Sequence, residues 1–166
     1  MSKNLKIEQV NYNREQFNKV VKEWDVSKGS KYLLRYPTVY ILNDTNDKNN
    51  YEVYVGETNN IKYRTKQHLI KGESEWLDLS NSDTSSCIIG HKYFNKSLTM
   101  YIENRLVQYL SSVDSVVKIY NNRTNQQNDF YTSDKLEEVF SEVWNELHKK
   151  QRTISNRKYS QGLSYI

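Results

Sequence analysis

Residues 38–42 (TVYIL) and 51–55 (YEVYV) decide the fold of this chain. Both stretches are rich in β-branched and aromatic residues, which favour extended strands. Between them, residues 43–50 are polar and rich in Asn and Asp, as is typical of turns. Gly56 ends the second stretch, and Pro37 stands just before the first, where a missing N–H is tolerated. The pattern therefore predicts a β-hairpin with a long loop.

Segments with helical periodicity lie on both sides of this hairpin. Three segments repeat apolar residues at helical spacing: 14–25, 96–110 and 134–148. A fourth helix is predicted over 60–70, where Asn59 or Asn60 can cap its start. Two further segments are strand-like: 87–89 and 116–120. This order predicts an α/β (α+β) fold in which a small mixed or antiparallel three-stranded sheet is flanked by helices.

The chain length suits one domain with additions at its ends. We expect an N-terminal helical extension over residues 1–36, the main domain over 37–150 and a basic tail or linker over 151–166. The apolar face of the helix at 134–148 is expected to pack in the core, because burying one stripe stabilises most helices.

Composition excludes several classes of protein. The single cysteine, Cys87, cannot form an internal disulfide or a cysteine-ligated zinc site, and its apolar surroundings predict a buried thiol. No segment resembles a signal peptide or approaches the roughly 20 apolar residues of a membrane span, so we expect a cytoplasmic protein without a membrane partner. Only five glycines are present, and none has the spacing of a nucleotide-binding loop.

The net charge of +4 is mild, and its distribution is uneven. Segments 62–71 and 148–166 are basic, whereas 134–146 is acidic. Basic segments of this kind either contact phosphates or form a solvated surface.

Six polar side chains can converge near the hairpin. Tyr40 and Tyr54 lie on its two strands, and Arg64 and His68 share one face of the helix that follows. Two others come from later segments: Glu103, which has no basic helical neighbour, and Asn121, which follows the last strand. Taken singly, each also fits a structural role, such as a strand aromatic, a solvated arginine or a turn residue.

The hairpin sequence also resembles a known family. Thr38-Val39-Tyr40 and Tyr54-Val55-Gly56 are similar to the paired signature of the GIY-YIG nucleases. The other matching residues stand at the family's spacing: Arg64, His68, Glu103 and the pair Tyr120-Asn121. The resemblance covers residues 37–125, and the runs 54–69 and 94–110 look most like modules at the front of larger proteins with an ATPase region. It therefore implies a domain of a longer protein, with a C-terminal ATPase region as its partner.

The resemblance implies a metal-dependent endonuclease that hydrolyses phosphodiester bonds, with DNA favoured over RNA. Glu103 would hold one Mg²⁺ or Mn²⁺, since hard cations prefer carboxylate oxygen, and Arg64 would bind the scissile phosphate. Tyr54 or Tyr40 would orient the attacking water or act as general base. His68 would assist proton transfer or contact phosphate, and Asn121 would position the site.

Two positions depart from the family pattern. Thr38 stands where the signature has glycine, and Glu57 follows Gly56 where many relatives carry lysine or a small residue. A carboxylate there either repels the substrate or assists the metal. Glu57 and the modest net charge keep open a nucleic-acid-binding module of the same fold with weak catalysis. A protein-interaction domain that uses the helix at 134–148 or the tail is the other alternative.

Overall fold

A computed structural model describes residues 4–27, 30, 32–45, 50–71, 79, 84–121 and 133–150. The strands are β1 (Leu5–Asn11), β2 (Thr38–Thr45), β3 (Tyr51–Thr58), β4 (Ser85–His91) and β5 (Val116–Ile119). The helices are α1 (Arg14–Val26), α2 (Tyr32–Arg35), α3 (Ile61–Lys71), α4 (Lys96–Leu110) and α5 (Ser133–Lys150). The predicted tail at 151–166 lies outside the described residues.

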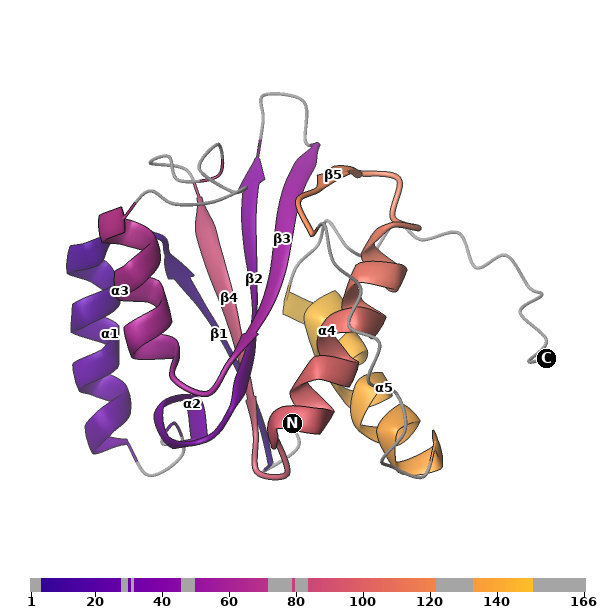
Figure 1. The fold of residues 1–166 in the computed structure, drawn as a ribbon, viewed down its shortest axis with the longest axis horizontal. Helices are drawn as coiled ribbons and strands as arrows, with labels where there is room; N and C mark the ends of the chain where they lie inside the picture. Colours follow the sequence, from indigo (N-terminus) through magenta and orange to yellow (C-terminus); the bar gives the residue numbers. More distant parts are fainter. Residues whose placement is uncertain are drawn as a thin grey trace.

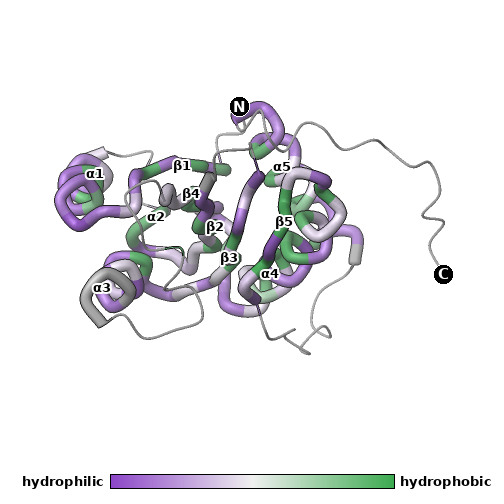
Figure 2. Tube along the Cα trace, turned by 90° about the horizontal axis from the view of Figure 1, so that it is seen from above, coloured by the Kyte–Doolittle hydropathy of each residue, from purple (hydrophilic) through white to green (hydrophobic). Residues whose placement is uncertain are grey.

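The strands form one mixed sheet in the order β1-β4-β2-β3-β5. The pairs β1–β4, β4–β2 and β2–β3 are antiparallel, and β3–β5 is parallel. Helices cover both faces: α1, α2 and α3 lie on one side of the sheet, and α4 and α5 on the other (Figures 1 and 2). The α+β class predicted from the sequence is confirmed.

The prediction of three strands was wrong, because the sheet has five. The short candidate at 87–89 is part of β4, an interior strand between β1 and β2 that is buried along its whole length. The other strand absent from the prediction is β1. It lies in the N-terminal segment 1–36, which the sequence pattern predicts as a helical extension, and it pairs with β4. The predicted hairpin is present as β2 and β3, with Thr38 opposite Thr58 and Thr45 opposite Tyr51.

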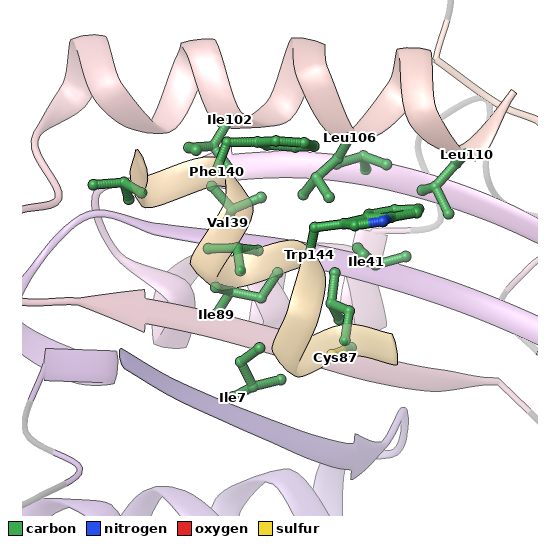
Figure 3. Packing of buried hydrophobic residues seen from close by; sticks show 14 of the residues in the cluster. Ile7, Val39, Ile41, Cys87, Ile89, Ile102, Leu106, Leu110, Phe140 and Trp144 are labelled. Carbon is green, nitrogen blue, oxygen red and sulfur yellow. The ribbon is translucent and has the colours of Figure 1, made fainter. Parts of the chain in front are cut away.

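Two hydrophobic cores lie on the two faces of the sheet. The larger core joins α4 and α5 to the strands. In Figure 3, Phe140 and Trp144 of α5 lie among Ile102, Leu106 and Leu110 of α4. The predicted packing of the helix at 134–148 is thus confirmed for this apolar face.

The smaller core lies under α1, α2 and α3. It contains Phe17, Trp24, Leu33 and Ile61, together with Tyr40. Because successive strand residues point to opposite faces, Tyr40 and Tyr54 lie on this side, whereas Val39 and Val55 lie in the larger core.

Two predictions from composition can be compared with this fold. Cys87 is 2% exposed, and burial raises the pKa of its thiol to about 12, so it is a structural residue. Among the described helices, none is both long and apolar enough to cross a membrane.

Candidate active site

Tyr40 is fixed in place by the glycine opposite it. Tyr40 on β2 pairs with Gly56 on β3, and its ring is 2% exposed. A Cβ atom at Gly56 would lie 2.4 Å from Cζ of Tyr40 and 2.5 Å from its hydroxyl oxygen. Only a residue without a side chain lets the ring lie flat on β3 at this point. The glycine of the second signature is therefore a packing requirement.

Tyr54 places a second hydroxyl on the same face. It lies two residues before Gly56, and its ring centroid is 6.1 Å from that of Tyr40. Tyr54 is half-buried, so its side chain lies where the smaller core opens to solvent. The two phenols thus form a pair with one deeply buried member and one accessible member.

Arg64 joins the two phenols from α3. Its Nε–H donates to the Tyr40 hydroxyl at 3.4 Å, and Arg64 also forms a hydrogen bond with Tyr54. The helix is capped so that Arg64 falls in its first turn: the Tyr63 N–H donates to Oδ1 of Asn60 at 3.0 Å. Asn60, one of the two predicted caps, is thereby confirmed.

The charge of Arg64 and the burial of the tyrosines act in opposite directions on the tyrosine pKa values. Burial raises the pKa of Tyr40 well above 10 and also raises that of Tyr54, whereas Arg64 lowers both. Burial has the larger effect in each case, so both phenols are protonated at neutral pH. For either tyrosine to act as a base, its pKa would have to fall, and this requires further positive charge next to its hydroxyl.

Glu103 comes from α4, which covers the other face of the sheet (Figure 1). It is half-buried on α4, and its charge contributes to raising the pKa of Tyr54. The strand β5 pairs with β3 over Tyr51–Val53 and ends there.

Asn121 completes the strand pairing where β5 ends. Its Oδ1 accepts from the Val55 N–H at 2.9 Å, and its Nδ2 donates to the Val55 carbonyl at 2.6 Å. One side chain thus satisfies both backbone groups of a residue next to Tyr54. In this structure Asn121 acts on the backbone of β3.

Sequence reasoning missed a third tyrosine. Tyr12, just after β1, is 6% exposed and packs in the same core as Tyr40 and Tyr54. The pKa of Tyr12 is raised, mainly by burial, and the positive charge of the nearby Arg64 opposes the rise. The sequence signal that could have identified Tyr12 is its spacing: Val10 and Tyr12 are two residues apart, as residues on one face of a strand are.

The predicted site residue His68 lies in α3, but its side chain is outside the described atoms.

Glu103 is the carboxylate that the sequence resemblance assigns to a divalent cation, and its chemistry can be compared with that assignment. Among the residues described, no three His, Cys, Asp or Glu side chains gather into a metal cluster. Glu103 therefore offers a single carboxylate, which suits Mg²⁺ because Mg²⁺ usually keeps several waters and takes one or two carboxylates. A zinc site with three or four protein ligands does not fit this part of the chain.

Comparison with known proteins agrees with this geometry. The family model of the GIY-YIG catalytic domain matches residues 36–121, more than half of the chain. The chain therefore belongs to the GIY-YIG family, a family of endonucleases, as the sequence resemblance predicted. No curated protein and no solved structure matches the chain.

Proposed function

We propose that this protein is a metal-dependent endonuclease that hydrolyses phosphodiester bonds in DNA with one divalent cation. The observation that carries the proposal is the cluster of Tyr40, Tyr54 and Arg64, in which Arg64 donates to the Tyr40 hydroxyl and the two ring centroids lie 6.1 Å apart. Phosphodiester hydrolysis needs an oriented water and stabilisation of the charge that develops on the phosphate. The choice of DNA follows the family resemblance.

Arg64 has the chemistry to bind the scissile phosphate. A guanidinium carries five N–H donors, so Arg64 can bond to both tyrosines and still donate to a phosphate oxygen. The bond from its Nε to Tyr40 fixes the plane of the group. That orientation reduces the ordering needed when the substrate binds.

The tyrosine pair and Glu103 would act on the water and the cation. The Tyr54 hydroxyl, at the accessible end of the pair, would hold the attacking water, and Tyr40 would hold Arg64 from behind. Glu103 would hold Mg²⁺ or Mn²⁺, which would supply charge neutralisation at the phosphate and lower the pKa of a water. His68 as a proton-transfer group, and a C-terminal ATPase region as partner, remain predictions from the sequence.

The test is nicking of supercoiled plasmid in Mg²⁺ or Mn²⁺, with an EDTA control. We expect cleavage by the wild type, none in EDTA, and a rate about 10²–10³-fold lower for Glu103→Ala and Arg64→Ala, because each removes a charge that acts in the transition state. Glu138→Gln is the matched control, since Glu138 on α5 pairs with Lys135 on the surface. Full activity of either site variant would contradict the proposed mechanism.

The same assay separates the alternatives. Labelled RNA and DNA of one sequence, compared side by side, test the preference for DNA. Salt-dependent binding without cleavage in either metal would favour the nucleic-acid-binding module. Absence of binding at low salt would favour the protein-interaction domain.

A further inference from the structure

Glu57 places a carboxylate at the contact between β3 and α4. It directly follows Gly56, and the alternation of the strand turns it to the face of Val55, away from Tyr40. Its side chain is 12% exposed. One carboxylate oxygen forms an ion pair with Nζ of Lys96. The other lies 3.3 Å from the Thr99 hydroxyl oxygen, whose single hydrogen it shares with the carbonyl oxygens of Lys96 and Asn95 at 3.0 and 3.1 Å. We call these three residues the Glu57 clamp.

The start of α4 favours a carboxylate at this position. Asn95 caps the helix by accepting from the Leu98 N–H, and the first turn contains no acidic residue of its own. The N-terminal end of a helix attracts negative charge through the aligned peptide dipoles. Glu57 supplies that charge from a different element, so the clamp joins the first turns of α4 to the end of β3.

Glu103 lies one helical turn beyond the clamp. Residues four apart in a helix share a face, so Thr99 and Glu103 follow one another along the same side of α4. Tyr54 lies on β3 three residues before Glu57. The clamp thus joins α4 and β3 close to where Glu103 approaches Tyr54.

We propose that Glu57 is a positioning residue that holds α4 against β3, and so fixes the place of Glu103 on α4 relative to β3, the strand that carries Tyr54. This inference rests on the proposed function, in which Glu103 holds the cation. It also accounts for the departure from the family pattern: Glu57 faces α4 and points away from Tyr40, and its oxygens lie against Lys96 and Thr99.

Glu57→Gln is the first variant to test, because it keeps the shape of the side chain and removes the charge. Loss of a group that orients a metal ligand costs about 10–100-fold in metal affinity or activity. We expect the Mg²⁺ concentration for half-maximal nicking to rise about 10-fold. Leu98, Ile102 and Leu106 keep α4 packed, so the variant should fold.

Glu137→Gln is the matched control, because Glu137 holds α4 from a different element, α5. Glu137 of α5 accepts from Tyr101 and Arg105 of α4, so its loss loosens α4 from α5 and leaves the contact with β3 intact. An unchanged metal requirement in Glu137→Gln, beside a raised one in Glu57→Gln, would support the clamp. An equal rise in both variants would overturn it, since general loosening of α4 would then be the cause.

A charge swap tests the pair directly. Glu57→Lys alone brings two cations together and should raise the metal requirement further, and the double variant Glu57→Lys/Lys96→Glu should recover most of the loss. The carboxylate that Lys96→Glu introduces also lies in the first turn of α4, where negative charge is favoured. A single Glu57→Lys variant as active as the wild type would overturn the proposal.

Hydrogen exchange gives a readout that does not depend on cleavage. In the wild type, the Thr99 N–H donates to the Asn95 carbonyl at 2.9 Å within the clamped turn. Amides in the first two turns of α4 should exchange faster in Glu57→Gln, and unchanged exchange would overturn the clamp. Failure of the proposed function can be distinguished from failure of the clamp. If the proposed function is wrong, the wild type itself would neither cleave DNA nor show Mn²⁺-dependent NMR broadening near Glu103.

Discussion

Substituting Gly56 by alanine tests how the tyrosine pair is built. The new Cβ would lie 2.4 Å from Cζ of Tyr40 and 2.9 Å from its Cε1. Carbon atoms in favourable contact are about 3.5–4.0 Å apart, so the ring must withdraw by about 1 Å. Tyr40 is 2% exposed and cannot move without displacing its neighbours.

The cost to stability and the cost to activity should differ in size. Overpacking a core costs about 1–3 kcal/mol, and the lower backbone entropy of alanine in the unfolded chain offsets part of it. Activity should suffer more. The bond from Nε of Arg64 to Tyr40 is already 3.4 Å long, so a shift of about 1 Å would break it. A displacement of that size can lower the rate about 10²-fold.

Urea denaturation and plasmid nicking on the same preparations would measure the two costs. Gly90→Ala is the matched control, because its Cβ would meet the flexible end of Leu33 at 2.8 Å, outside the proposed site. We expect Gly90→Ala to lose stability and to keep its activity. If Gly56→Ala were as active as the wild type, the argument that Gly56 seats Tyr40 would be refuted.

Four other changes have defined outcomes. Asn121→Ala removes two hydrogen bonds to the backbone of β3 and should cost about 1–3 kcal/mol in urea denaturation; a smaller loss would mean that water replaces the amide. The Thr38 hydroxyl oxygen is buried without a hydrogen-bond partner in the described part of the chain, so Thr38→Val should raise the midpoint of unfolding, and a lowered midpoint would contradict this. Above pH 10 an unfolded tyrosine loses its proton while buried Tyr40 keeps its own, so stability should fall as the pH rises; Tyr40→Phe should make the fall shallower. Burial lowers the pKa of His91 although Glu142 opposes this, so the unfolded chain binds the proton first and stability should fall as the pH drops below 6.5; an unchanged acid limb in His91→Gln would contradict this.

Local sequence patterns were sufficient to predict the hairpin and the longer helices. The strands β2 and β3 combine β-branched and aromatic residues around a polar turn, and α4 repeats its apolar residues every three or four positions. The strand β1 was missed because LKIEQVN is rich in polar residues, and its alternation of Leu5 and Ile7 is interrupted at Gln9. Its identity as a strand depends on β4, a partner that no local pattern reveals.

The sequence predicted which strand or helix carries each candidate site residue. It did not predict which of these side chains contact one another. Tyr40, Tyr54 and Arg64 do converge, as helical and strand periodicity indicated. The place of Glu103 depends on how α4 packs against β3, and the bonds of Asn121 to Val55 depend on the register of β5 along β3. The contacts of Glu57 with α4 depend on the same tertiary arrangement, so sequence alone left the role of Glu57 open.

The pairing of β1 with β4 has a consequence during protein synthesis. Gln9 bonds to Ser85 across 76 positions of the chain, so β1 leaves the ribosome long before its partner exists. At about 5–20 residues per second, that interval is roughly 4–15 s. Leu5, Ile7 and Val10 have no strand partner during that time, whereas β2 and β3 can pair as soon as both are made. The β2–β3 hairpin, which carries both tyrosines of the signature, can therefore form before the sheet closes around it.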